Sequence, residues 1–181
     1  MEQNDTSIPL LITNYHVLEN AVAGFVELHI AEKGLPSEKS IRIQFNESII
    51  NGNKLGNLDL IAIPLASTLN ELKQKGINIF YRTVDQNMLP KEEQIEYFAA
   101  IEDITFIGYP SGLYDSVNKL PIIRQGITAT PIWNQFNGEN VFLIDAGVFP
   151  GSSGSPVFIY NHGSYPTKDG IAIGNRLLFI G

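Results

Sequence analysis

The chain has 181 residues, a formal net charge of −7 at pH 7 and no cysteine. With only 12 Lys and Arg residues, it lacks the clustered positive charge that nucleic acid and anionic membrane partners require, so neither is expected. The lack of cysteine excludes disulfides, a thiolate nucleophile and a Cys-ligated zinc. The 44% hydrophobic content is enough to bury one sizeable core or two small ones.

The N-terminal segment has neither a basic region nor a long apolar run, and no apolar run in the chain approaches the ~18 residues of a membrane span. We therefore expect a cytoplasmic protein without a membrane anchor. A phosphate-binding GK[ST] loop, a dinucleotide fingerprint and a metal-ligand cluster are also missing from the sequence, so no cofactor is expected. The sequence carries no mark of an oligomeric state.

Short apolar runs separated by Gly and Pro predict strands in the first half of the chain, over residues 8–13, 23–32, 40–45 and 58–65. In the second of these runs Val26, Leu28 and Ile30 fall on one face and Phe25, Glu27 and His29 on the other, which is typical of a half-buried antiparallel strand.

A short helix is predicted over residues 67–76. Thr68 followed by Glu71 has the spacing of a capping box, and Gly76 stands where a left-handed C-terminal cap belongs.

The polar residues 88–99 are expected to hold another helical turn or two and to connect two halves. After them, short β-like segments resume over residues 103–110, 120–133, 140–147, 155–160 and 171–181. The sequence therefore predicts an all-β fold of two packed antiparallel barrels with one or two short helices. The predicted domains are residues 1–87, a connection over 88–102, and residues 103–181.

The chain contains three histidines. His29 lies within an alternating strand and His162 in a polar loop, where a surface or locally bonded ring is the ordinary interpretation. His16 ends the apolar segment LLITNYHV, at the point where a strand meets a loop. A single histidine there is still more often structural than catalytic.

Two further residues, like His16, lie where a predicted strand meets a loop or turn. Asp59 opens the apolar segment LDLIAIPL, and a carboxylate there is costly to bury unless it is paired. Taken alone, it is best explained as a turn residue at the strand entrance. Ser153 lies in PGSSGSP, which as composition alone suits a linker. Its glycines would equally allow a tight turn that presents backbone N–H groups toward one point.

The order and spacing of these three residues indicate that they act together. Hydrolysis by an activated serine requires a hydroxyl nucleophile, an imidazole base and a carboxylate that orients the imidazole. His16 and Asp59 are 43 residues apart, and Asp59 and Ser153 are 94 residues apart. In chymotrypsin the same order has intervals of about 45 and 93 residues. Each motif is weak by itself, but the order and both intervals together favour a triad.

The segments LITNYHV, NLDLIAI, FIGYPSG and DAGVFPGSSGSPVF resemble successive blocks of the trypsin-like, chymotrypsin-fold serine peptidases. The resemblance is strongest to cysteine-free bacterial members, including the glutamyl endopeptidase and Deg-type groups. It implies two packed six-stranded-type barrels and a serine endopeptidase that hydrolyses peptide bonds of a polypeptide substrate through an acyl-enzyme intermediate.

Carried over by position, the resemblance assigns roles to individual residues. Ser153 would be the nucleophile, His16 the general base and then general acid, and Asp59 the residue that orients His16. The backbone N–H groups of Gly151 and Ser153 would form the oxyanion hole. The specificity pocket would be bordered by three residues without charge, Gly147, Val148 and Phe149.

The chain departs from its relatives at several points. Ser152 stands where relatives have Asp or Asn, so an ion pair from that position is not expected. Val148 stands where glutamyl endopeptidases have threonine, which argues against glutamate specificity. Relatives also carry a strand before LITNYHV and a pocket-wall strand after RLLFIG, so both barrels are expected to be incomplete at the chain ends.

Two alternatives stay open, and only the first of them is motivated by the chain ends. One is a catalytically impaired fragment or a protease-like module that binds peptide or protein. The other is an unrelated β domain whose matches are accidental.

Overall fold

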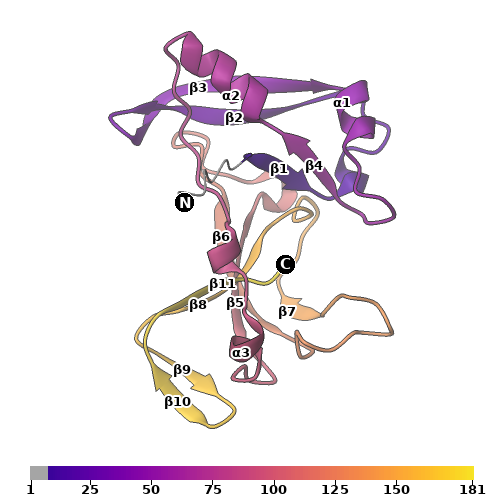
Figure 1. The fold of residues 1–181 in the computed structure, drawn as a ribbon, viewed down its shortest axis with the longest axis vertical. Coiled ribbons are helices and arrows are strands. Elements are labelled where there is room, and N and C mark those ends of the chain that lie inside the picture. The colour runs from indigo at the N-terminus through magenta and orange to yellow at the C-terminus, as the bar shows by residue number, and fades with distance from the viewer. Residues whose placement is uncertain (1–7) are drawn as a thin grey trace, which may run out of the picture. The chain divides into compact units, whose positions relative to one another are not determined.

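The computed structural model describes residues 8–181, so the predicted absence of a leader in residues 1–7 lies outside the described residues. The chain divides into two compact units (Figure 1). The N-terminal unit is Met1–Thr83 and the C-terminal unit is Val84–Gly181. Each is described by itself below.

The N-terminal unit consists of two antiparallel strand pairs with short helices between them. Strand β1 pairs with β4, and β2 pairs with β3. The strands are β1 (Leu10–Thr13), β2 (Ala23–Glu32), β3 (Leu35–Asn46) and β4 (Ile61–Pro64), and the helices are η1 (Tyr15–Val17), α1 (Glu47–Gly52) and α2 (Ala66–Gln74).

Alternation along these strands builds the core of the N-terminal unit. Val26 and Leu28 of β2 pack against the core, whereas Phe25 on the opposite face is 58% exposed. This confirms the half-buried strand predicted over residues 23–32. The buried core residues are Ile43, Phe45, Ile50, Ile61, Ile63 and Leu65, and fully burying such a side chain contributes about 1.5–3 kcal/mol.

Helix α2 corrects one prediction and confirms another. The helix begins at Ala66, directly after β4, and Leu65 is its N-cap without a side-chain hydrogen bond. Thr68 therefore lies inside the helix, and the predicted capping box is wrong. At the other end Gly76 has a φ of +76°. Its N–H donates to Lys73 O at 3.0 Å and the Ile77 N–H to Leu72 O at 2.9 Å, the bonding pattern of a glycine-ended helix.

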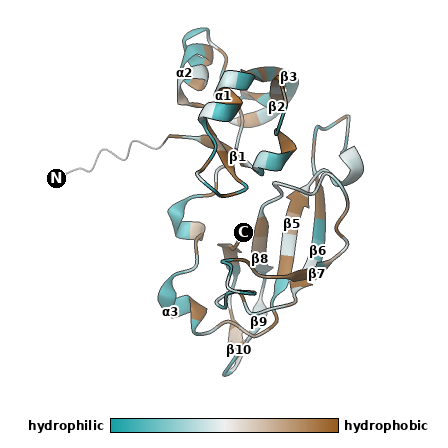
Figure 2. Ribbon diagram, turned by 90° about the vertical axis from the view of Figure 1, so that its right-hand side faces the viewer, coloured by the Kyte–Doolittle hydropathy of each residue, from teal (hydrophilic) through white to brown (hydrophobic). Residues whose placement is uncertain are grey.

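The C-terminal unit is organised by a five-stranded antiparallel sheet with the strand order β11-β8-β5-β6-β7. Strands β8, β5 and β6 lie side by side in Figure 2, and β9 and β10 form a separate hairpin. The strands are β5 (Asp103–Gly108), β6 (Ile122–Thr128), β7 (Ile144–Ala146), β8 (Val157–Asn161), β9 (Ser164–Thr167), β10 (Gly170–Ile173) and β11 (Arg176–Phe179), and the helices are η2 (Gln86–Met88), α3 (Glu92–Ile95) and η3 (Pro110–Gly112).

The all-β prediction is confirmed, since every strand pair is antiparallel and the helices are short. Within residues 8–181 the strands form one five-stranded and three two-stranded sheets rather than a closed barrel. None of the helices in this part of the chain is long and apolar enough to cross a membrane.

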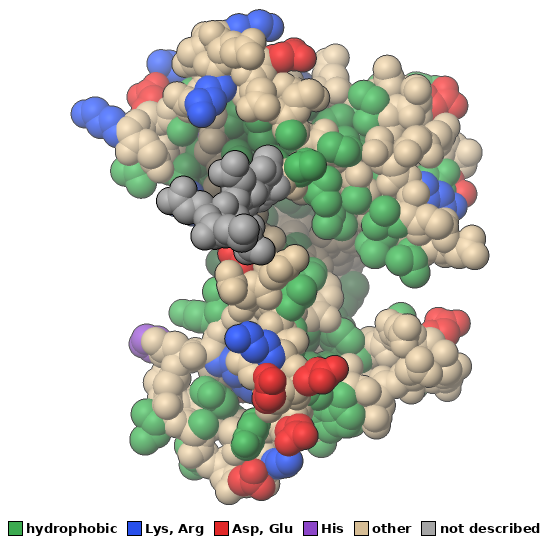
Figure 3. Space-filling view, viewed as in Figure 1, with side chains coloured by type: hydrophobic (Ala, Val, Ile, Leu, Met, Phe, Trp, Pro, Cys, Tyr) green, Lys and Arg blue, Asp and Glu red, His purple; other side chains and the backbone are tan. Residues whose placement is uncertain are grey.

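Large hydrophobic side chains are also exposed, as the surface in Figure 3 shows for both units. On β10, Ile171 and Ile173 are 79% and 92% exposed. Because residues two apart share one face of a strand, they form an apolar stripe on the β9–β10 hairpin.

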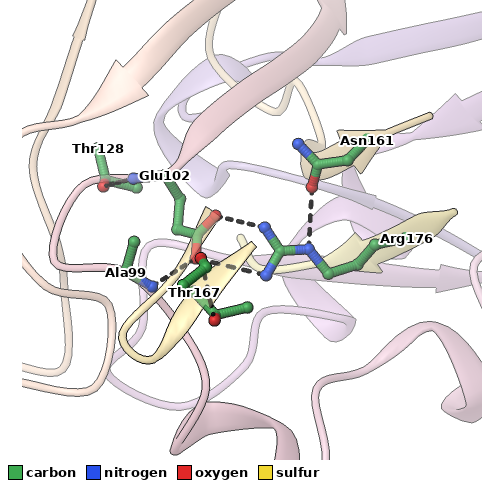
Figure 4. A network of polar contacts seen from close by, with 7 residues as sticks. Ala99, Glu102, Thr128, Asn161, Thr167 and Arg176 are labelled. Atoms are coloured by element: carbon green, nitrogen blue, oxygen red, sulfur yellow. Dashed lines mark hydrogen bonds and ion pairs between the residues drawn. The ribbon is translucent and has the colours of Figure 1, made fainter. Parts of the chain in front are cut away.

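A buried ion pair joins three segments of the C-terminal unit (Figure 4). Glu102, just before β5, is 1% exposed and Arg176 of β11 is 8% exposed. Both guanidinium Nη atoms donate to the Glu102 carboxylate, and Nε donates to Asn161 Oδ1 of β8 at 2.9 Å. Glu102 Oε1 also accepts the Ala99 N–H at 2.8 Å. The charges are therefore paired and well supplied with hydrogen bonds, which is what a buried ion pair requires.

Replacing Glu102 by glutamine should destabilise the C-terminal unit by about 3–5 kcal/mol, because the Arg176 charge then stays buried without a counter-charge. Denaturant unfolding followed by fluorescence of Trp133, the only tryptophan, measures this unit directly. The matched control is Glu139→Gln at an exposed position, which should change stability by no more than about 0.5 kcal/mol. Equal effects of the two substitutions would contradict a structural role for the ion pair.

Candidate active site

His16 and Asp59 meet because β1 pairs with β4. The register places Thr13, the last residue of β1, opposite Ile61, the first residue of β4. His16 follows β1 within η1, and Asp59 lies two residues before β4. Antiparallel pairing thus brings together two residues that are 43 positions apart in the sequence.

Asp59 holds His16 at two points. The His16 backbone N–H donates to Asp59 Oδ1 at 2.8 Å, and ring atom Nδ1 lies 2.6 Å from Asp59 Oδ2. A carboxylate can only accept a hydrogen bond, so the proton of the neutral ring resides on Nδ1 and the ring lone pair on Nε2. The pair therefore fixes both the orientation and the tautomer of the imidazole, as a general base requires.

Residues next to His16 hold the backbone of Asp59. The Asn14 side-chain amide donates to Asp59 O at 3.0 Å and lies 3.4 Å from Oδ2, and the Tyr15 N–H donates to Asp59 O at 3.2 Å. Asn14 was not among the predicted site residues. A polar residue two positions before the histidine, at the end of an apolar strand, was the available signal.

The hydrogen bonds from His16 lower the pKa of Asp59. The His16 side chain is the largest cause and its backbone N–H the next, and both outweigh the partial loss of solvent around the carboxyl group. Asp59 is therefore ionised at neutral pH. Its negative charge faces the ring that must become positive when it takes a proton.

Ser153 lies at the exposed tip of two successive tight turns. The Ser152 N–H donates to Phe149 O at 3.0 Å, and the Ser155 N–H donates to Ser152 O at 3.1 Å. In the first turn Pro150 is followed by Gly151 with a φ of +84°, the sequence and conformation of a type II turn. Gly154 repeats the positive φ at +77° in the second. The run is therefore a defined double turn and not a flexible linker.

The turn of η3 packs against Gly151. The Ser111 N–H donates to Pro150 O at 2.5 Å, and a Cβ on Gly151 would lie 2.6 Å from Tyr109 O. In a planar trans peptide the N–H points opposite to the C=O. The Gly151 N–H is therefore directed away from Ser111, and only glycine fits at this position. Ser111 itself has a φ of 52°. Neither Tyr109 nor Ser111 was among the predicted site residues.

The chain matches the trypsin-like peptidase domain over residues 2–164, which is most of its length. It belongs to this family. No curated protein is similar enough to the chain to serve as a relative in this comparison.

In this trypsin-like peptidase, the described structure brings His16 and Asp59 into contact within the N-terminal unit, whereas Ser153 belongs to the C-terminal unit. For the other two histidines the sequence predicts surface or locally bonded rings. His29 Nδ1 lies 2.8 Å from Ser37 O, a local contact within the β2–β3 hairpin, and His162 lies in the turn after β8.

The three residues predicted to border the specificity pocket lead from β7 into the double turn that carries Ser153. Val148 and Phe149 are 57% and 54% exposed, and Gly147 is also exposed. They present apolar side chains and backbone to solvent, and none supplies a charge.

Proposed function

We propose that this peptidase is a serine endopeptidase that hydrolyses polypeptides through an acyl-enzyme intermediate. Ser153 is the nucleophile, His16 the general base and acid, and Asp59 the residue that orients His16. The observation that supports this proposal most strongly is the two-point contact between Asp59 and His16, because it directs the basic Nε2 atom of the ring away from the carboxylate.

In the proposed reaction, Nε2 of His16 takes the proton of the Ser153 hydroxyl while Oγ attacks the carbonyl carbon of the scissile bond. The resulting oxyanion is stabilised by the N–H groups of Gly151 and Ser153. The imidazolium then donates its proton to the leaving amine as the C–N bond breaks, which leaves the acyl-enzyme. Water then attacks the ester carbonyl while His16 takes one of its protons. The bond between the acyl carbon and Ser153 Oγ breaks, the imidazolium returns the proton to Oγ, and the carboxylic acid product is released.

We further infer an uncharged side chain on the acyl side of the cleaved bond, because residues 147–149 offer no charge to a partner. Val148 stands where glutamyl endopeptidases typically have a threonine, which argues against glutamate as that side chain. The sequence blocks around His16 and Ser153 favour placement among the cysteine-free bacterial members of the family.

A fluorophosphonate probe tests the proposal, since it reacts with an activated serine and not with an ordinary hydroxyl group. The expected result is one label per chain, located at Ser153 by fragmentation of the peptide that also contains Ser152 and Ser155. Heat-denatured protein should take up no label. A folded chain that takes up none, or that takes it up at Ser152 or Ser155, would contradict the assignment, and the first result would favour a peptide-binding module.

A further inference from the structure

Arg124 lies beneath the nucleophile turn and contacts both ends of the segment that precedes Ser153. It belongs to β6, opposite Phe106 of β5, and its guanidinium lies 4.3 Å from the centre of the Phe106 ring. Nη1 donates to Gly147 O at 3.0 Å, and Nη2 donates to Ser152 Oγ at 3.0 Å. We call these two hydrogen bonds the Arg124 clamp. One planar, rigid group thereby fixes the separation between residues 147 and 152.

Ser152 transmits this contact to the turn. Its hydroxyl donates to Phe149 O at 2.6 Å and accepts the Phe149 N–H at 3.3 Å in addition to the Arg124 hydrogen bond. A serine hydroxyl has one donor and two acceptor positions, so all three are used. The side chain of Ser152 is therefore a junction between Arg124 and the turn that carries Gly151.

The surroundings of Arg124 are unusual for a purely structural arginine. Among residues 8–181, the buried atoms Arg124 Nε and Ser155 Oγ have no hydrogen-bond partner. A Cβ on Gly108 would lie 1.9 Å from Ser155 Oγ and 3.7 Å from Arg124 Nη2, so these groups gather at Gly108. Buried polar groups that stay unsatisfied are costly, and an uncharged residue would avoid the cost. Arg124 thus carries the cost of one unsatisfied buried N–H, while its two Nη atoms are committed to Gly147 and Ser152.

We propose that Arg124 is a positioning residue for catalysis, which acts through Ser152 and Gly147 to hold the oxyanion N–H groups of Gly151 and Ser153 in place. This inference rests on the proposed function. Because the oxyanion exists only after attack on the carbonyl, a loosened turn lowers kcat and leaves KM nearly unchanged.

The test compares Arg124→Met, which removes both hydrogen bonds, with Arg124→Lys, which keeps the charge but not the two-pronged geometry. The matched control is Arg82→Met. Arg82 also stacks on an aromatic ring, that of Phe80, and donates to a backbone carbonyl, but it lies in the N-terminal unit. Trp133 fluorescence verifies that the C-terminal unit of each Arg124 variant is folded, and far-UV circular dichroism verifies the fold of Arg82→Met, which lies in the N-terminal unit.

The first readout is amide hydrogen exchange at Phe149 and Ser152, which does not depend on activity. Exchange should be at least about tenfold faster in Arg124→Met, intermediate in Arg124→Lys and unchanged in Arg82→Met, because about 1.4 kcal/mol of lost local stability, within the range of hydrogen bonds to charged groups, is a tenfold change. Unchanged exchange in Arg124→Met would overturn the clamp.

The second readout is kcat with a peptide substrate, together with the rate of fluorophosphonate labelling. Both should fall by up to about a hundredfold in Arg124→Met, the cost of a misplacement of about 1 Å, with partial recovery in Arg124→Lys. Ser152→Ala combined with Arg124→Met should be little worse than either alone, since both interrupt one contact. Faster exchange with undiminished kcat would overturn the positioning role, whereas a wild-type chain that takes up no label would overturn the proposed function instead.

Discussion

Replacing Ser153 with alanine should lower the rate of peptide hydrolysis by about a millionfold, because the variant lacks the hydroxyl that is proposed to form the acyl-enzyme. Ser153 is exposed at the tip of the double turn, so the substitution should leave stability within about 0.5 kcal/mol of wild type. Turnover of a fluorogenic peptide measures the first effect and denaturant unfolding the second.

The matched control for this variant is Ser164→Ala, at another exposed serine of the same unit, which should retain full activity. Activity of Ser153→Ala within a hundredfold of wild type would show that a different group, Ser152 or Ser155 first of all, carries out the attack.

The second large effect is expected at Asp59. In Asp59→Asn the side-chain amide can donate to Nδ1 of His16, which moves the ring proton to Nε2 and removes the lone pair that serves as the base. For this kind of triad the change lowers kcat by about four orders of magnitude while the geometry stays intact. If kcat of Asp59→Asn fell by less than about tenfold at every pH, the assigned role of Asp59 would be contradicted.

The same variant separates catalysis from stability. Because the folded-state pKa of Asp59 is lowered, its ionised form stabilises the fold above the ordinary carboxyl value of 3.8, and this contribution is lost as the pH falls through the lowered value. The difference in unfolding free energy between wild type and Asp59→Asn should therefore shrink below about pH 4. Both side chains are 52% exposed, so the difference at neutral pH should be modest.

Local patterns were enough to predict most strands and both partners of the His16–Asp59 contact. Alternation marked β2 over its full length, and the apolar runs beside His16 and Asp59 marked β1 and β4. The pairing of those two strands then accounts for the contact. These features depend on neighbouring residues or on spacing, both of which can be read from a sequence.

The features that were missed have weak local signals or depend on contacts at a distance. Helix α1 is short and capped by Asn46, whose side chain accepts the Ile49 N–H at 2.9 Å. Its few residues form a pattern that cannot be told from that of a turn. β9 contains Pro166 and pairs only with β10. In the sequence Arg124 is only a charged residue within an apolar strand. Its contact with Ser152, 28 positions away, exists only in the folded chain.

The central claim is that Ser153 and His16 act on one substrate bond, and a crystal structure of the chain tests it most directly through the distance between Ser153 Oγ and His16 Nε2. We predict a separation within hydrogen-bond reach, about 2.6–3.2 Å, with Nδ1 still bound to Asp59. A folded chain in which the two atoms lie well beyond that reach, with His16 Nε2 directed away from the nucleophile turn, would contradict the account.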